Sequence, residues 1–231
     1  MFDLAKKLID FILHIDAHLK DIVASYGYLT YGVLFLIVFA ETGFVVTPFL
    51  PGDSLLFAAG ALSAPADSQL NVHLLALLLW LAAVLGDTVN YWIGNRIGPA
   101  VFRRDDSVFL RKKHLERAHA FFEKYGGRAI ILARFVPIVR TFVPFVAGAG
   151  SMTYRRFFAY NVIGGFAWIY AFTYAGYFFG TLPFVEKNFK IVIVAIIVLS
   201  IVPIVREFWR AWRGKRQAAA NADRGISGIS G

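Results

Sequence analysis

Two apolar stretches interrupted by helix-breaking residues limit the possible folds of this chain more than any other feature. They cover residues 41–62 and 128–150. The breaking residues are Pro48, Pro51 and Gly52 in the first stretch, and Pro137 and Pro144 in the second. Proline removes a backbone donor and ends or kinks a helix. Broken backbone at membrane depth is tolerated only where protein buries it or a wet cavity satisfies it. We therefore predict two re-entrant helical hairpins.

Four further apolar segments are candidates for membrane-spanning helices: residues 26–40, 72–94, 157–180 and 189–205. Crossing a bilayer takes about 20 apolar residues in a helix. Of the 231 residues, 58% are hydrophobic and 17% are charged, whereas about a quarter are charged in a typical soluble domain. The chain has no cysteine, so disulfides and thiolate zinc sites are excluded. These features predict an all-α integral membrane protein.

Both ends of the chain differ from this apolar region, which we place at residues 25–207. Residues 1–24 carry apolar side chains at helical spacing with charges between them, which predicts an amphipathic helix in the membrane interface. Residues 208–231 are basic, then small and polar, and we expect a disordered tail. His14 and His18 lie one helical turn apart, but no further metal ligand is near them. We therefore expect no metal and no cofactor.

The distribution of Lys and Arg predicts the orientation in the membrane. Basic residues concentrate in residues 96–128, at Arg155 and Arg156, and at the C-terminal end, and short basic loops face the cytoplasm. The loops 63–71 and 181–188 are poor in basic residues and are expected to face outward. The two hairpins then enter from opposite faces, as in an inverted repeat. We expect cytoplasmic termini, and a net charge of +9 that reflects these loops and anionic lipid rather than nucleic acid.

Five ionisable residues lie in or beside the apolar stretches: Glu41, Asp53, Asp87, Arg134 and Arg140. A charge at the centre of a bilayer costs at least about 2.5–3.5 kcal/mol, so such residues are paired, face water or serve a function. The first hairpin supplies two acids and the second supplies two arginines. If the hairpins meet near the midplane, the two sets of charges attract each other.

These residue types suit a proton-linked anion site. Arginine stays charged and binds phosphate through two parallel hydrogen bonds. A carboxylate in apolar surroundings gains and loses a proton near neutral pH, so Glu41 and Asp53 would compete with phosphate for Arg134 and Arg140 only when ionised. Asp87 is either a third relay residue or a structural cap. The alternative is that the pairs are salt bridges that only hold the hairpins together.

The sequence shows no hydrolase motif, because it lacks a serine nucleophile elbow, an HExxH pattern and a P-loop. We therefore expect no enzyme activity. Gly86, Gly94 and Gly98 are expected to permit close packing of helices rather than to bind a ligand. The spacing of Gly94 and Gly98 allows that packing within one chain or between two copies, so a homo-oligomer stays open.

Three segments carry a resemblance to a known family. They read FAETGFVVTPFLPGDSLLFAAGAL, GDTVNYWIGNRIG and RFVPIVRTFVPFVAGAGSM, and they resemble the DedA family, the bacterial branch of the SNARE-associated, VTT-domain membrane proteins. The resemblance runs from about residue 27 to residue 180. It implies inverted repeats with opposed re-entrant hairpins, functional acids at Glu41 and Asp53, and functional arginines at Arg134 and Arg140. Many members have Glu where this chain has Asp53, which keeps the charge and shortens its reach.

The resemblance also implies a function and a location. Members are linked to the proton-motive force and to lipid translocation. We therefore expect a multi-pass protein of the bacterial inner membrane that flips a lipid phosphate, undecaprenyl phosphate, with protons and membrane lipids as its partners. The alternatives are a less selective flippase or scramblase for phospholipids such as phosphatidylethanolamine, a proton/cation antiporter, and a membrane organiser that transports nothing.

Overall fold

The computed structural model describes residues 15–44, 52–103, 119–120, 122–150, 152–196 and 198. These residues form helices joined by turns and short links, and no strand occurs among them. The predicted all-α fold is therefore confirmed for the described part of the chain. Of the predicted interfacial segment 1–24, residues 15–24 are helical and residues 1–14 lie outside the description, as does the predicted tail 208–231.

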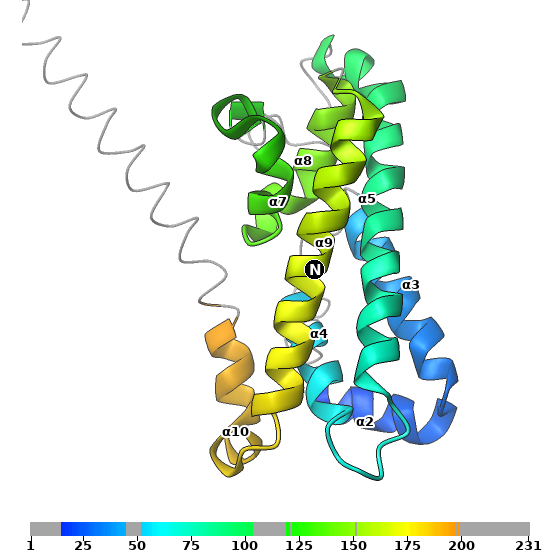
Figure 1. The fold of residues 1–231 in the computed structure, drawn as a ribbon, viewed down its shortest axis with the longest axis vertical. Coiled ribbons are helices and arrows are strands. Elements are labelled where there is room, and N and C mark those ends of the chain that lie inside the picture. Colours follow the sequence, from blue (N-terminus) through cyan, green and yellow to red (C-terminus); the bar gives the residue numbers. More distant parts are fainter. Residues whose placement is uncertain are drawn as a thin grey trace, which may run out of the picture.

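Two long helices, α5 (Val72–Arg103) and α9 (Tyr154–Phe179), run side by side through the molecule (Figure 1). Among the described helices, these two are long and apolar enough to cross a membrane. Both were expected from the sequence as spans at 72–94 and 157–180. Helix α5 continues past the expected end at Gly94 because Gly94 and Gly98 pack against another helix instead of ending this one.

Shorter helices lie at opposite ends of this long pair (Figure 1). At one end are α2 (Ile15–Tyr26), α3 (Leu29–Gly43) and α4 (Gly52–Leu62). Toward the other end lie the 3-10 turn η1 (Gly126–Arg128), α7 (Ala129–Ala133) and α8 (Pro137–Ala149). Helix α10 (Pro183–Lys187) and a further helical segment at 189–196 follow α9. The expected span 26–40 overlaps α3, which ends at Gly43 and, at 15 residues, is shorter than the two candidate spanning helices. Of the expected span 189–205, the structure describes residues 189–196 and 198.

The short helices pack on the long pair in a crosswise pattern, in which each pair of short helices contacts both long helices. Helices α3 and α8 contact α5, whereas α4 and α7 contact α9. Glycines bring the backbones together at the two main contacts. A methyl group at Gly60 of α4 would overlap the carbonyl oxygen of Thr173 in α9, and one at Gly94 of α5 would overlap the carbonyl oxygen of Phe145 in α8. Glycine is needed at these positions because no side chain fits between the helices.

The three glycines singled out in the sequence all serve helix packing within one chain. Gly86 lies against Thr42 and Gly43 of α3, and Gly98 lies against Ala149 of α8. With Gly94 also covered by α8, the packing alternative within one chain is confirmed for these three residues.

The helix breaks that the sequence predicted agree with the structure at some positions and not at others. Pro48 and Pro51 lie outside the described residues, while Gly52 begins α4 and Pro137 begins α8. The prediction that Pro144 also interrupts the helix is wrong, because α8 continues through Pro144 to Ala149. Proline inside a membrane helix is tolerated where neighbouring groups bond to the backbone atoms that lose their helical partner. Here the Asn90 side chain of α5 donates to the carbonyl oxygen of Thr141, 2.8 Å away, next to the carbonyl that Pro144 leaves without its helical donor.

Gly94 offers a test of the crosswise packing. Gly94→Ala should destabilise the protein by about 1–3 kcal/mol, because the new methyl group pushes α8 away from α5. Gly32→Ala is the matched control, since Gly32 lies in α3 with no atom within 4 Å of the position of its missing side chain. Thermal unfolding of both variants in detergent provides the measurement. Equal melting temperatures for the two variants would contradict this packing.

Candidate functional site

Charged residues from four short elements meet between the two long helices. Glu41 lies in the last turn of α3 and Asp53 in the first turn of α4, while Arg134 directly follows α7 and Arg140 lies in the first turn of α8. All are buried or nearly so: the exposed fractions are 2% for Glu41 and 4% for Arg134, and 10% for the Arg140 side chain. The sequence predicted that these four residues come together, and the structure places them in one cluster.

Arg140 joins both acids of the first predicted hairpin. Its Nη1 donates to Asp53 Oδ1 at 2.9 Å, and its Nη2 donates to Glu41 Oε1. A single guanidinium group therefore connects α8 to α3 and α4 at once. Both carboxylates are held by one planar guanidinium group. Movement of either carboxylate therefore also disturbs the bond to the other.

Arg134 has a different set of partners from the one that the sequence suggested. Its Nη2 donates to Asp87 Oδ2 at 2.5 Å and to the Oδ1 atom of Asn161. Asn161 in turn donates from Nδ2 to the carbonyl oxygen of Val84, at 3.0 Å. Arg134 is thus paired with the two long helices rather than with an acid of the first hairpin. Asp87, for which the sequence left a relay and a cap open, is placed as an ion-pair partner.

Trp168 completes the cluster. Its ring is fully buried, and its Nε1 donates to Asp53 Oδ1 at 2.8 Å. The guanidinium carbon of Arg140 lies 5.1 Å from the ring centroid, and that of Arg134 lies 5.7 Å from it. Sequence reasoning missed Trp168 and Asn161. For Asn161, a lone amide inside an apolar span was an available signal, whereas a tryptophan in such a span looks like any lipid-facing aromatic residue.

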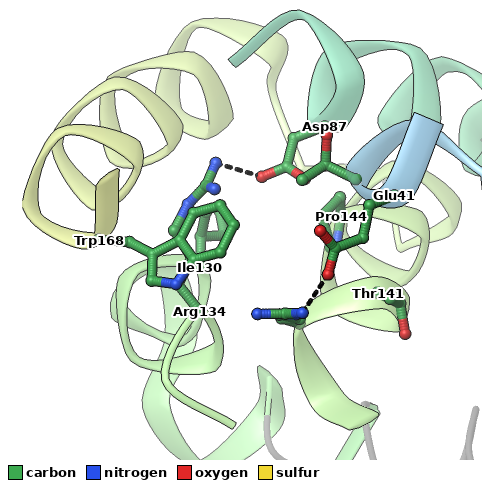
Figure 2. Close-up of a pocket in the computed structure, with 9 residues that line it drawn as sticks. Glu41, Asp87, Ile130, Arg134, Thr141, Pro144 and Trp168 are labelled. Atoms are coloured by element: carbon green, nitrogen blue, oxygen red, sulfur yellow. Dashed lines mark hydrogen bonds and ion pairs between the residues drawn. The ribbon is translucent and has the colours of Figure 1, made fainter. Parts of the chain in front are cut away.

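A small cavity lies at the centre of the cluster (Figure 2), with a volume of about 10 Å³. Its lining comprises Glu41, Thr42, Asp87, Ile130, Arg134, Arg140, Thr141, Pro144 and Trp168. This volume corresponds to about one water molecule. The described conformation is therefore closed around its ion pairs. In this conformation the cavity has no room for an anion such as phosphate beside the ion pairs.

The cluster contains one more acid than base. Three carboxylates (Glu41, Asp53 and Asp87) face two guanidinium groups, so the formal charge is 2 − 3 = −1 when all are ionised. A buried net charge is costly, and one bound proton neutralises it. Among the described residues, Glu41 Oε2 is a buried oxygen with no hydrogen-bond partner. The cluster can therefore hold a proton on one of its carboxylates.

Gly52 sets the distance between the two acids. A side-chain carbon at this position would lie within 2.8 Å of the Glu41 carboxyl carbon, closer than non-bonded atoms can approach. The glycine therefore lets the start of α4 approach the end of α3, so that Asp53 and Glu41 share Arg140. This contact and the start of α4 account for the glycine of the PGD segment.

These observations define a helical membrane protein with a buried charged centre. The VTT domain matches residues 50–178 of the chain. Protein DedA of Escherichia coli (strain K12) is 58% identical over 217 residues, which cover 94% of this chain and 99% of that protein. The chain belongs to the VTT-domain family, also called the DedA family.

Two more distant relatives agree with this assignment. The uncharacterized membrane protein Rv0364 of Mycobacterium tuberculosis (strain ATCC 25618 / H37Rv) is 49% identical over 81% of this chain and 82% of its own length. Inner membrane protein YqjA of Escherichia coli (strain K12) is 34% identical over 76% of this chain and 79% of its own length. No solved structure matches the chain. The names of these relatives are consistent with a protein of the bacterial inner membrane.

The pair of Asp87 and Arg134 can be tested by a double-mutant cycle. Asp87→Asn should lower the free energy of unfolding by about 3–5 kcal/mol, because it leaves the Arg134 charge buried and unpaired. Arg134→Gln in the same chain should recover much of that loss, because it removes the second charge. Thermal unfolding in detergent is the measurement, and Asp67→Asn in the exposed loop before α5 is the control. A single variant as stable as the control would contradict the buried ion pair.

Proposed function

We propose that the protein is a proton-linked transporter that moves a lipid phosphate, undecaprenyl phosphate, across the bacterial inner membrane. The observation that carries this proposal is the pair of buried guanidinium groups, each held by carboxylates around a closed cavity. Guanidinium binds phosphate and carboxylate through the same forked geometry. No covalent bond is made or broken in such a cycle, so the proposed role is transport rather than catalysis.

In the proposed cycle, protonation of the acids opens the site. A protonated carboxyl group no longer attracts Arg140 as an ion, so the guanidinium group becomes available to the phosphate of a lipid. Loss of the protons restores the competing carboxylates, which displace the phosphate again. The excess of one acid over the two arginines means that the closed, unloaded site favours one bound proton. Proton uptake and phosphate binding are thereby linked.

The proposed topology is an inverted repeat. We propose that α3 with α4 and α7 with α8 are two re-entrant hairpins that enter from opposite faces and meet at the charged cluster. Support comes from their positions toward opposite ends of α5 and α9 (Figure 1) and from their crosswise contacts with those helices. From the basic residues 96–128 we infer that the end of the molecule that carries η1, α7 and α8 (Figure 1) faces the cytoplasm.

A lipid is the proposed substrate because the site lies between helices whose outer faces are apolar. Exposed leucines follow one side of α5 at helical spacing, namely Leu74, Leu77, Leu81 and Leu85. Such a surface suits contact with lipid chains. A phosphate headgroup could then occupy the charged centre while its apolar chain stays in the bilayer. This arrangement supports a lipid phosphate better than a free inorganic ion.

A second candidate is a proton/cation antiporter, and the acid excess of the cluster favours it. A cation could balance the third carboxylate where the proposed cycle uses a proton. The two functions differ in their cargo. A proton/cation antiporter moves protons against sodium or potassium in vesicles free of polyprenyl lipid, whereas a lipid phosphate transporter does not.

Binding tests the phosphate site directly. Arg140→Ala should weaken binding of a short-chain polyprenyl phosphate by about 10- to 100-fold, because it removes a charge-assisted hydrogen-bonding group. Native binding should be tighter at low pH, where the acids are protonated and the arginines are free. Arg155→Ala is the matched control, since Arg155 is exposed at the start of α9. The measurement is calorimetric titration of purified protein in detergent. Undiminished affinity in the Arg140 variant would exclude this residue from the phosphate site.

Transport in liposomes tests the proton link. The native protein should move a fluorescent polyprenyl phosphate between leaflets faster under a pH gradient than without one. Glu41→Gln should remove this dependence on the gradient, because the glutamine cannot gain or lose the proton. Asp67→Asn should behave like the native chain. Lipid movement by the Glu41 variant that still follows the gradient would place the proton elsewhere. No lipid movement with any variant, together with cation flux, would favour the antiporter.

A further inference from the structure

Two charged side chains of the cluster have hydrogen-bonding capacity that the ion pairs do not use. Glu41 accepts from Arg140 through Oε1, whereas its Oε2 atom is buried and, within the described part of the chain, has no hydrogen-bond partner. The bonds from Arg134 to Asp87 and Asn161 both leave from Nη2, and its Nε atom is buried without a partner among the described residues. A buried polar atom that stays unsatisfied costs about 1–3 kcal/mol. Both side chains are therefore expected to have a further partner.

Both side chains line the small cavity at the centre of the cluster, and Figure 2 shows the Glu41 carboxylate at its wall. The volume of about 10 Å³ corresponds to one water molecule. A buried water molecule typically makes about three hydrogen bonds. Asp87 lines the same cavity, so that two acids and the Arg134 guanidinium group surround this space. The cavity is thus large enough and polar enough for a single water molecule.

The charges around the cavity favour a neutral occupant. A metal cation would lie next to the guanidinium groups of Arg134 and Arg140, and an anion would lie next to the carboxylates of Glu41 and Asp87. Like charges a few ångströms apart repel each other strongly where little water screens them. Water can both donate and accept. It can accept from Arg134 while it donates to Glu41 Oε2.

The cavity also connects the two separate groups of ion pairs. Glu41 belongs to the pairs of Arg140, and Asp87 is paired with Arg134. Because the space holds about one water molecule, that molecule lies next to both acids. With its two hydrogens directed at the two carboxylates and its oxygen accepting from Arg134, it reaches the usual number of bonds.

Charged groups reach this centre from every short element and from α5. They are Glu41 of α3, Asp53 of α4, Asp87 of α5, Arg134 after α7 and Arg140 of α8. Helix α9 contributes the uncharged side chains of Asn161 and Trp168. A proton held by the cluster therefore has carboxylates on both sides of the cavity as possible acceptors.

We propose that the cavity binds one ordered water molecule, which bonds to Glu41 Oε2, Asp87 and Arg134 and passes the proton of the cluster between Glu41 and Asp87. When Glu41 is protonated, its O–H group gives its proton to the water oxygen, and the water gives one of its own protons to the Asp87 carboxylate. The water molecule is restored, and the charge of the cluster does not change. The proton transfer rests on the proposed function, whereas the water site does not.

A crystal structure of the full chain grown in lipid, at a resolution that shows ordered water, tests the site without any lipid phosphate. The expected result is a density peak in the cavity within about 3.2 Å of Glu41 Oε2 and of one Arg134 nitrogen. Clear side chains around a cavity with no peak would overturn the proposal. So would a peak that becomes stronger when rubidium replaces sodium, since the occupant would then be a cation.

Variants that fill the cavity test the role of the water. Ile130 of α7 lines the cavity and is 2% exposed, so Ile130→Phe should occupy the space and remove the density peak. Ile130→Met is a second filling variant that strains the core less, because methionine is flexible and fills irregular gaps. Ile169→Phe and Ile169→Met are the matched controls, since Ile169 of α9 is fully buried and is not part of the cavity lining. Melting temperatures in detergent show that the variants compared are folded.

Transport of a fluorescent polyprenyl phosphate in liposomes shows whether the proton uses this water. The filling variants should lose the acceleration by a pH gradient that the native chain and the Ile169 variants show. Full acceleration in a variant whose density lacks the water would overturn the proton transfer. A filling variant that no longer binds a short-chain polyprenyl phosphate would also overturn it, because the loss would then lie in phosphate binding. If the native chain moves no polyprenyl phosphate, the proposed function fails and the proton transfer fails with it, while the crystal density still decides the water site.

Discussion

The structure depends on the ion pairs that Arg140 makes with Glu41 and Asp53. Each of these groups would be costly to bury alone in apolar surroundings. Once paired, they fix the depth at which the end of α3 and the starts of α4 and α8 meet. The helix ends that carry the charges are therefore positioned by electrostatics, while the bodies of the helices are positioned by glycine contacts with α5 and α9. The chemistry of the site and the placement of these helix ends therefore have the same physical origin.

The two arginines have different structural roles. Arg140 connects short helices to one another, whereas Arg134 connects a short segment to Asp87 of α5 and Asn161 of α9. Asn161 is itself tied to the backbone of α5 at Val84. The Arg134 group is thus hydrogen-bonded to the long helices, whereas the Arg140 group is hydrogen-bonded to the short helices and contacts α9 through the ring of Trp168.

Much of the site could be predicted from the sequence because charges in apolar stretches are conspicuous. The signs of the charges on the two broken stretches indicated that Glu41 and Asp53 would meet the arginines. The pairing of Arg134 with Asp87 was missed, because partners are set by the rotation and depth of α5 relative to α7, which no local pattern records. Trp168 was missed because its sequence context is that of a lipid-facing residue. Helix α8 continues through Pro144 where it packs against α5, and this contact, which includes the bond from Asn90 to the carbonyl oxygen of Thr141, is far away in sequence.

The crosswise packing gives each pair of short helices one arm on each long helix: α3 on α5 with α4 on α9, and α8 on α5 with α7 on α9. A change in the spacing of α5 and α9 therefore pulls the arms of both pairs apart at the same time. The Arg140 bonds join the two pairs at their tips. Displacement of the helices at either end of the molecule would therefore stretch these bonds. The charged centre is thus a shared joint between the two pairs of short helices.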